Sequence, residues 1–539
     1  MIWRIGHGVV RPARALSALL LAICMGCAAG PMPRDRPTDF DVIVIGGGMG
    51  GLSAATHLSV KGLKVLLLEQ HHKVGGCTSS FSRDEFNFDV ALEEMCGGGG
   101  DGLLNRLLRE AGVYEKIDLI PIPELYRTIY PGLDFTCPGD LEGAVRAFSE
   151  KWPEEREGIE EFFELMGDIY EDLSELQEIY RKGSFAKFLT LALVPFRQNS
   201  LMLNYNKTLQ QVMDERLKDP ALKAALSQHW FFYGPPPSRL WAPVFLLANY
   251  AYLTDGAWHI RGSSQALANA YAERIVETGG EVRAGTRVTS IQVEEGRVVG
   301  VETEYGDRLR SRYVISSADP FQTFFRLLSE EDSPAEVREQ ISSMEPSNSF
   351  VGVYLGLDVM PGYFGITDHE VYYNTSFDTD AMYDAMMEGR FKEGLISMTF
   401  YGSLRDGFYA PPGKSVLVLH AYSRFEGWPT EREPYGWAKE DMAEALLDLA
   451  EKVLPDLREH IEVQETITPV TIQEFTMQQG GVPYGWNFTP EQWERLPNRT
   501  PIDGLYLAGS WTRPSHGVAG AQVSGHQAAR LILDREGIE

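Results

Sequence analysis

The sequence predicts an α/β protein in which a nucleotide-binding domain built on a parallel sheet is interleaved with a second domain of α+β structure. Three observations support this fold class. A strand, a glycine-rich turn and a helix follow one another near residue 40, and a second strand with a glycine-rich turn lies near the C-terminus. Between them, long aromatic and helical stretches carry no such turns. With 539 residues and 44% apolar composition, the chain can bury the cores of more than one domain.

The first element is a Rossmann-like β-α-β unit. Residues 40–45 form a β-branched run typical of buried parallel strands, and it leads into the glycine-rich turn 46–51. Gly46 permits the tight turn, Gly48 lets the backbone approach a pyrophosphate, and Gly51 lets helix and strand pack closely, as in G-x-G-x-x-G. The phosphates would lie at the N-terminus of the following helix. The candidate nucleotide contacts in this turn are Gly46, Gly48, Met49, Gly50 and Gly51.

An acidic residue closes this unit. The apolar run 64–68 indicates the second strand, and it ends in Glu69, with Gln70 next to it. A carboxylate at this offset accepts hydrogen bonds from the hydroxyls of the adenosine ribose, and its charge disfavours a 2′-phosphate. We therefore predict that Glu69 and Gln70 contact the nucleotide and that NADP is not the cofactor.

A second pair of glycines indicates which dinucleotide binds. Gly75 and Gly76 lie in Val-Gly-Gly-Cys-Thr-Ser at residues 74–79, a layout typical of flavoproteins rather than of nicotinamide dehydrogenases. In FAD-binding families with this layout, the glycines let the chain pass close to the ribityl diphosphate. An ordinary loop is the alternative interpretation of this segment.

The C-terminal segment argues against an ordinary loop. Residues 504–507 indicate a strand that leads into Gly509 and Ser510, and Gly517 and Val518 open the final helix. In such flavoproteins this returning segment meets the first β-α-β unit, and the helix N-terminus stabilises the negative charge of the reduced flavin. We therefore predict FAD as the cofactor, held by residues from both ends of the chain.

From Asp39 onward the chain resembles the family of phytoene desaturases, carotenoid isomerases and retinol saturases and, more distantly, the flavin amine oxidases. Beside the nucleotide unit, the specific pieces are Phe88-Asp89 and residues 256–263. The resemblance implies a two-dinucleotide-binding-domain flavoprotein fold of the amine-oxidase type. It also implies chemistry on conjugated C=C bonds of a carotenoid- or retinoid-like lipid, and a backbone contact from Val288 to the adenine.

Two positions depart from the family pattern. Many relatives carry an acid after the glycine of the last motif, where it holds the ribityl or phosphate end, whereas this chain has Ser510, whose hydroxyl can still donate to phosphate. Gly262-Ser263 replaces a common pair of glycines.

The domain boundaries follow the motifs. A β-meander is expected from strands near 286–293, 298–304 and 308–315, and in the family it returns to the cofactor domain. The FAD-binding domain is predicted to comprise residues 38–135, 251–330 and 471–539, and the α+β substrate-binding domain residues 136–250 and 331–470.

Aromatic segments in the middle of the chain are the candidate substrate site. Residues 230–233 and 241–252 are strongly apolar and aromatic, which usually indicates a core, but a long polyene also needs a deep apolar tunnel. Residues 185–196 are too short to span a bilayer, and they indicate either a core helix or an interfacial helix.

Composition excludes several functions. The formal charge of -27 repels polyanions, so no nucleic acid is expected as a partner. Five scattered cysteines indicate neither a disulfide framework nor a metal site. No motif of a hydrolase or an NTPase is evident, and no motif identifies the electron acceptor. We name no catalytic residue; His516 could donate a proton near the flavin, but a structural role is the alternative.

Residues 1–30 are predicted to lie outside the fold. Three arginines precede an apolar run that ends in small residues, as in a secretory signal, and Cys27 follows it as in a bacterial lipoprotein. Lipidated Cys27 would attach the protein to a membrane, whereas an uncleaved anchor on the cytoplasmic face is the alternative. Both alternatives predict membrane association.

Three functions compete. The first is desaturation, saturation or cis–trans isomerisation of an apolar polyene. The second is flavin amine oxidation, which the larger apolar middle fits less well. The third is a lipid-escort protein of the same fold, which predicts a damaged nucleotide motif, whereas Gly46, Gly48, Gly51 and Glu69 are all present.

Overall fold

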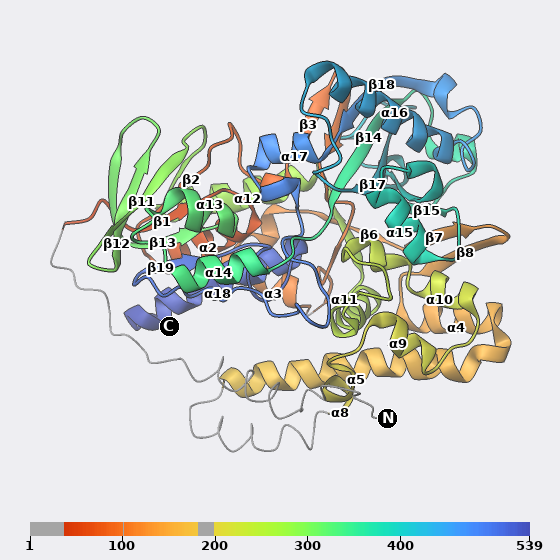
Figure 1. Cartoon of the computed structure of the whole chain (residues 1–539), viewed down its shortest axis with the longest axis horizontal. Coiled ribbons are helices and arrows are strands. Elements are labelled where there is room, and N and C mark those ends of the chain that lie inside the picture. The colour runs from red at the N-terminus through yellow and green to blue at the C-terminus, as the bar shows by residue number, and fades with distance from the viewer. Residues whose placement is uncertain (1–36, 101, 182–198) are drawn as a thin grey trace, which may run out of the picture.

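The computed structural model describes residues 37–100, 102–181 and 199–539. The predicted leader 1–30 and the apolar segment 185–196 lie outside the described residues. Within the described ranges, no helix combines the length and the apolarity that crossing a membrane requires. Two large sheets dominate the fold, one toward each end of the long axis (Figure 1).

The first sheet carries the nucleotide motifs. Its strands pair in parallel around β1, which lies between β2 and β13. The side chains of β1 and β2 are almost fully buried, as expected for a sheet covered on both faces. This arrangement confirms the predicted Rossmann-like unit. The parallel strands are β10 (Glu281–Arg283), β2 (Val65–Leu68), β1 (Phe40–Ile45), β13 (Arg308–Ser316) and β19 (Leu505–Leu507).

Helices from both ends of the chain pack together on this sheet. Helix α2 (Met49–Val60) contacts both α12 (Ser264–Glu277) and the C-terminal α18 (Gly517–Glu536). A Cβ atom at Gly525 of α18 would lie only 2.1 Å from the carbonyl oxygen of Gly50, so glycine allows this close approach. The final helix is therefore fixed against the first one.

The predicted β-meander is confirmed. Strands β11 (Val288–Glu294) and β12 (Arg297–Thr303) pair antiparallel, and β12 pairs antiparallel with the start of β13. The turn between β11 and β12 has positive φ angles at Glu295 and Gly296. The long β13 then returns the chain to the parallel sheet.

The second sheet is mixed. All its strand pairs are antiparallel except the parallel pair of β15 and β7. The boundary predicted at residue 135 falls inside β8, and strand pairing moves it to the segment before β7. The physical reason is that Tyr126 and Tyr130 of β7 are buried in the core of this sheet. The strand order is β18 (Ile461–Ile467), β14 (Ser349–Leu357), β17 (Ser415–Ser423), β16 (Leu395–Phe400), β15 (Glu370–Asn374), β7 (Glu124–Tyr130) and β8 (Leu133–Pro138).

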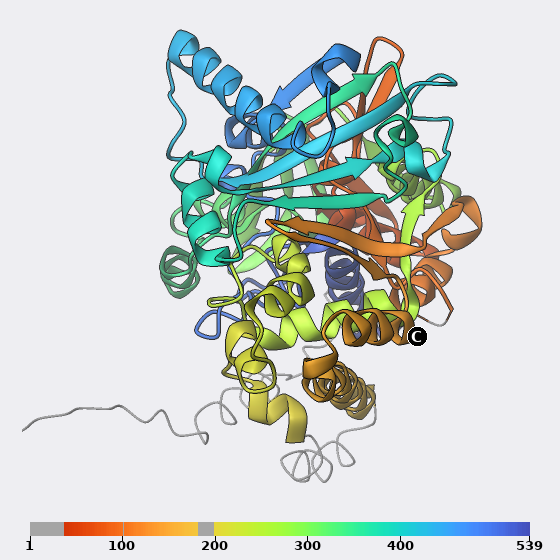
Figure 2. The ribbon, with the colours of Figure 1, turned by 90° about the vertical axis from the view of Figure 1, so that its right-hand side faces the viewer.

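Helices cover the second sheet. Those coloured orange to green lie beneath it in Figure 2, and α5 packs along α11. On the sheet's other side, α16 (Arg432–Ala450) contacts β16 and β17. The lower helices are α4 (Leu141–Lys151), α5 (Arg156–Arg181), α8 (Asn199–Asn204), α9 (Leu209–Asp214), α10 (Pro220–Leu226) and α11 (Ala242–Asp255).

Short elements connect the two halves. The small sheets are β3 (Ser80–Arg83) with β4 (Phe86–Asp89), and β5 (Met95–Cys96) with β9 (Ala257–Ile260) and β6 (Leu119–Ile122). The remaining α-helices are α3 (Leu103–Ala111), α13 (Pro320–Gln322), α14 (Ala335–Ser343), α15 (Thr379–Met387) and α17 (Pro469–Thr476).

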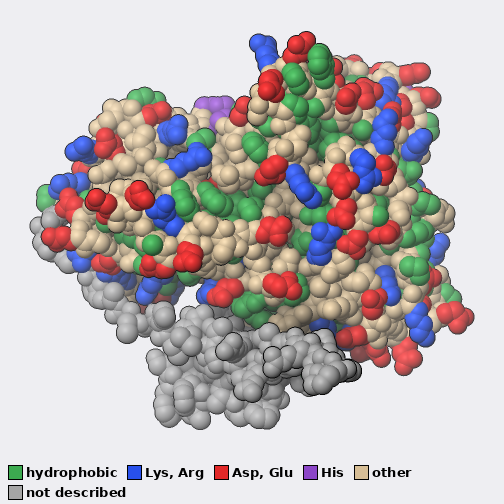
Figure 3. All heavy atoms as spheres, viewed as in Figure 1, with side chains coloured by type: hydrophobic (Ala, Val, Ile, Leu, Met, Phe, Trp, Pro, Cys, Tyr) green, Lys and Arg blue, Asp and Glu red, His purple; other side chains and the backbone are tan. Residues whose placement is uncertain are grey.

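Acidic side chains are spread over the face in Figure 3, with lysines and arginines between them.

Candidate active site

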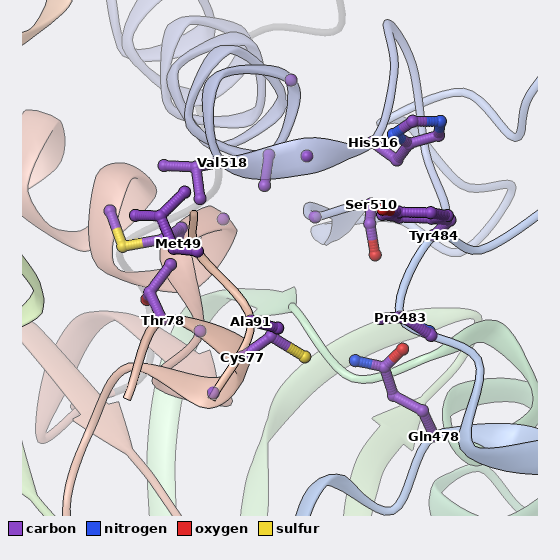
Figure 4. Close-up of a pocket in the computed structure, with 18 of the residues that line it drawn as sticks. Met49, Cys77, Thr78, Ala91, Gln478, Pro483, Tyr484, Ser510, His516 and Val518 are labelled. Atoms are coloured by element: carbon purple, nitrogen blue, oxygen red, sulfur yellow. The ribbon is translucent and has the colours of Figure 1, made fainter. Parts of the chain in front are cut away.

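One large cavity joins the two halves of the molecule. Its volume is about 1680 Å³, beyond the roughly 300–1,000 Å³ of pockets for small drug-like ligands. Its walls include the glycine turn after β1, the loop after β2, the start of α18 and apolar residues of α11. Figure 4 shows Met49, Thr78 and Val518 on one side, with Tyr484 and His516 across the space.

The first glycine turn has the geometry of a phosphate-binding turn. Gly46 has a φ of +94°, which favours glycine, and a Cβ at Gly51 would lie 2.0 Å from the carbonyl oxygen of Gly46. A Cβ at Gly48, by contrast, would meet no atom within 4 Å. Gly48 begins α2 without a side-chain cap, so the helix N-terminus opens onto the cavity and fits an anionic diphosphate.

The C-terminal glycine turn meets the first one. A Cβ at Gly50 would lie 2.6 Å from both the Cα and the backbone nitrogen of Gly509. Gly509 itself has a φ of +104°, and Gly517, which opens α18, has a φ of +72°. Helix α18, like α2, lacks a side-chain cap at its N-terminus. Two uncapped helix N-termini therefore border one cavity, as a flavin dinucleotide requires.

Glu69 holds the turn and faces the cavity. Its Oε2 accepts a hydrogen bond from the backbone N–H of Gly47 at 2.6 Å, and its Oε1 accepts one from that of His71 at 2.7 Å. Burial raises the pKa of Glu69, and these two backbone bonds lower it in part. Each oxygen keeps a lone pair for a ribose hydroxyl.

The structure brings the predicted cofactor residues together. Gly51 alone does not line the cavity, because it serves the packing of α2 against the turn. Val288 enters the wall at the start of β11, next to Arg287 and Thr289. The predicted residues that line the cavity are Gly46, Gly48, Met49, Gly50, Glu69, Gln70, Gly75, Gly76, Val288, Gly509, Ser510, Gly517 and Val518.

Sequence reasoning missed the loop after β13. Ser317 and Ala318 line the cavity, and a Cβ at Gly46 would lie 3.4 Å from the backbone carbon of Ser317. The position of this loop in the sequence could have indicated this, because residues at the carboxyl end of a parallel strand in such a sheet commonly contact the ligand. Ser317 and Ala318 directly follow Ser316, the last residue of β13.

The two family-specific motifs meet in space. The Asp89 carboxylate accepts hydrogen bonds from the Ser264 hydroxyl at 2.8 Å and from the Tyr409 hydroxyl at 2.6 Å. Burial raises the pKa of Asp89 to about 6, although these hydrogen bonds lower it. Asp89 therefore joins β4 to the start of α12, and Tyr409 connects both to the second domain.

The far part of the cavity is apolar and aromatic. Helix α11 contributes Val244, Leu247, Ala248 and Tyr252, so the predicted segment 241–252 does line the cavity. Other walls come from the remaining predicted aromatic segment, from α5 and α8, and from the second sheet. Residues in these walls include Ile169, Tyr170, Leu201, Met202, Phe231, Phe232, Tyr233 and Phe350, and Phe488 adds to them from the loop before β19.

His516 lies between the two parts. Its ring stacks on Tyr484 with centroids 4.6 Å apart and contacts Phe488 at 4.9 Å. Burial lowers the pKa of His516 well below its usual value, and the charge of Arg495 lowers it further. At neutral pH the imidazole is therefore uncharged, which suits a hydrogen-bonding role better than release of a proton from an imidazolium.

Polar groups interrupt the apolar wall. Glu93, Glu94, Ser397 and His420 line the cavity, and sequence reasoning did not find them. The Glu-Glu pair carries no motif, and Ser397 and His420 lie on strands of the second sheet. Only the packing of that sheet against the loop before β5 brings these groups to the cavity.

Three side chains of types that commonly bind metal ions lie together outside the cavity. His57, Glu110 and His526 have ligand atoms within 4.8 Å of one another on α2, α3 and α18. The sequence predicted no metal site, and none of these three residues lines the cavity.

Comparisons of the sequence with known proteins agree with this geometry. Residues 49–533 match the family described as flavin containing amine oxidoreductase. A chloroplastic prolycopene isomerase of Daucus carota is 29% identical over 94% of this chain and 82% of its own length. A phytoene desaturase (neurosporene-forming) of Rhodobacter capsulatus is 26% identical over 91% and 94%. An all-trans-retinol 13,14-reductase of Danio rerio is 25% identical over 93% and 87%.

Solved structures share the fold. An oxidoreductase from Methanosarcina mazei is 18% identical, with a TM-score of 0.62 over 91% of this chain and all of the other. A putrescine oxidase double mutant is 14% identical, with a TM-score of 0.60 over 92% and 99%. These likenesses confirm the amine-oxidase-like fold.

Proposed function

The chain belongs to the flavin containing amine oxidoreductase family, and from this premise we propose that it acts on the conjugated C=C bonds of an apolar polyene. It is a flavoenzyme with FAD as cofactor. The proposed reaction class is desaturation, saturation or cis–trans isomerisation of a carotenoid- or retinoid-like lipid. The names of the three curated relatives support this class, since each concerns a polyene.

The observation that carries the proposal is the continuity of the cavity. Its glycine-rich end has the features that hold FAD, and its other end is lined by aromatic and aliphatic side chains such as Leu247 and Tyr252. A rigid, apolar, elongated substrate gains binding free energy from such walls, at roughly 25 cal/mol for each Å² removed from water. A small amine would leave most of this surface unused.

This geometry assigns different roles to the cofactor and to the protein. Bound FAD supplies the electron-pair chemistry that changes in C=C bonds need. The protein's aromatic walls orient the polyene and exclude water, and the neutral His516 and Tyr484 form a stacked wall between the two ends. No side-chain nucleophile is required.

We also propose that the enzyme works at a membrane surface. Polyenes partition into lipid, and α8 both lines the cavity with Leu201 and Met202 and exposes Leu203 to solvent. The signal-like residues 1–30 agree with attachment through Cys27 or through an uncleaved anchor on the cytoplasmic face. Membrane flotation of the full chain and of a Cys27→Ser variant would test the two forms of attachment.

The direct test is an anaerobic absorbance titration of the purified holoprotein with polyenes. Bleaching of the flavin by a polyene, or a shift of polyene bands that needs reduced flavin, is the expected result. Rapid bleaching by amines with release of hydrogen peroxide would contradict the proposal in favour of amine oxidation. Failure to bind FAD would contradict it in favour of a lipid escort.

A further inference from the structure

Glu94 is a buried carboxyl group in the wall of the substrate half of the cavity. Its exposed fraction is 5%, and within the described part of the chain neither carboxyl oxygen has a hydrogen-bond partner. Leaving a buried polar group without a partner costs stability, so native proteins rarely retain one without a purpose.

The neighbouring carboxyl groups are satisfied by the protein itself. Glu370 accepts hydrogen bonds from the hydroxyls of Ser397 at 2.5 Å and Thr399 at 2.7 Å. An oxygen of Glu93 lies 3.4 Å from Nδ1 of His420. Glu94 therefore differs from both, because described residues provide each of them with a partner and none of the described residues provides one for Glu94.

The surroundings keep Glu94 in its acid form. Burial raises the pKa of Glu94 well above its usual value, and the nearby charges of Glu370 and Glu93 raise it further. Burial also raises the pKa of Glu370 to about 8. Near neutral pH, Glu93, Glu94 and Glu370 are therefore not all charged at once. A protonated carboxyl group has one O–H to donate and one oxygen that accepts.

The ligand must supply the missing partner. Tyr233 and Tyr252 of the aromatic wall lie near Glu94, since ionisation of the Glu94 carboxyl group would raise the pKa of both tyrosines. The complementary molecule is thus mostly hydrocarbon and carries one oxygen that can pair with a carboxylic acid. A pure hydrocarbon would bury Glu94 without a partner, and sites built to hydrogen-bond a substrate group reject analogues that lack it.

We propose that Glu94 is a specificity-determining residue which donates a hydrogen bond to a hydroxyl or carbonyl oxygen of an oxygenated polyene. The enzyme thereby prefers oxygenated polyenes over the corresponding hydrocarbons. This inference rests on the proposed function of the same cavity, and it adds the substrate class.

The test compares ligands that differ only in oxygen. Zeaxanthin and β-carotene share one chromophore, and retinol and its deoxygenated hydrocarbon form a shorter pair. Dissociation constants are measured on the holoprotein from shifts of the polyene bands, and double-bond products are analysed separately. We expect at least one oxygenated ligand to bind about tenfold more tightly than its hydrocarbon.

Two variants separate the hydrogen bond from the fold. Glu94→Gln keeps a donor and an acceptor of the same shape, so the preference for the oxygenated ligand should persist. Glu94→Leu removes the polar group, and we expect the preference to vanish because the hydrocarbon gains affinity. The flavin spectrum and the melting temperature of each variant report whether the protein remains folded with FAD bound.

The outcomes distinguish this inference from the proposed function. Equal binding of both members of each pair by the wild type, or an unchanged preference in Glu94→Leu, would overturn the role of Glu94 while leaving polyene chemistry intact. A clear preference without any change in double bonds would support Glu94 and contradict the proposed reaction. Binding of neither polyene would overturn both.

Discussion

The two ends of the cavity are built in opposite ways. The nucleotide end consists of backbone turns in which glycines prevent collisions. A Cβ at Gly51 would lie 2.0 Å from a carbonyl oxygen, and one at Gly50 would lie 2.6 Å from the backbone of Gly509. The substrate end consists of side chains from α11 and the second sheet, with a few polar groups such as Glu94. The packed glycines of these turns, such as Gly50 and Gly51, tolerate almost no substitution, whereas a side-chain wall can change its ligand while the fold persists. The difference explains how one cofactor site can serve many substrates.

The largest effect should come from Gly51→Ala. The new methyl group would lie 2.0 Å from the Gly46 carbonyl oxygen, so the turn must move, and we expect a loss of more than about 4 kcal/mol in the free energy of unfolding. Denaturant unfolding and the flavin content of purified protein measure this.

Gly48→Ala is the matched control. Its methyl group meets no protein atom within 4 Å, so the apoprotein should keep its stability within about 1 kcal/mol while its FAD affinity falls. Equal destabilisation by both substitutions would contradict the open space at Gly48, and an unchanged FAD affinity in Gly48→Ala would contradict its place in the cofactor site.

The next effect concerns Glu69. Glu69→Ala removes the acceptor of the Gly47 and His71 backbone hydrogen bonds and the predicted ribose contact, so the FAD dissociation constant should rise about a hundredfold. Glu69→Gln keeps one acceptor oxygen and should give a smaller rise. Fluorescence titration of the apoprotein with FAD measures both, and unchanged affinity in Glu69→Ala would contradict the ribose role.

A smaller effect is expected from Glu370 in the second sheet. Its pKa is about 8 in the folded protein because of burial, above the usual 4.5, so its folded state holds a proton that the unfolded chain releases. The contribution of Glu370 to the free energy of unfolding is fully present below about pH 4.5 and is lost as the pH rises toward 8. The loss amounts to roughly 2 kcal/mol between pH 6 and pH 8.

Glu370→Gln should remove this part of the pH dependence. Denaturant midpoints of both proteins, measured from pH 5 to pH 8.5, should therefore move closer together or cross as the pH rises. Parallel curves would mean that Glu370 titrates as it does in the unfolded chain.

The smallest effect should come from the apolar wall. Ala248 faces the cavity from α11, and Ala248→Trp would fill part of it, raising the dissociation constant of a polyene about tenfold while the flavin spectrum stays the same. Ala248→Ser is the control for a change that adds little volume. Loss of FAD in Ala248→Trp would contradict the separation of the two ends.

The nucleotide half could be predicted because its signals are local. The run 40–45, the turn that follows it and Glu69 lie within one supersecondary unit, so spacing alone fixes their relative positions. The β-meander was also predictable, since its turns at Glu295-Gly296 and near Gly306 have positive φ angles that glycine favours.

The substrate half could be predicted only in part. Its aromatic segments were recognisable, yet aromatic stripes also occur in closed cores. The domain boundary predicted at residue 135 falls inside β8, because strand partners are chosen at long range. Glu93 and Glu94 precede a two-residue strand, and nothing in their neighbours in the sequence indicates a cavity.

The sequence by itself determined the Rossmann-like unit, the cofactor and the family resemblance, because short-range glycine and strand patterns dictate backbone conformation. Only the tertiary structure decided that Gly50 meets Gly509, that α11 lines the same cavity, and that no residue in the described ranges forms a hydrogen bond with the Glu94 carboxyl group. The physical reason is that burial and hydrogen-bond satisfaction depend on which segments pack together, and those contacts join residues hundreds of positions apart.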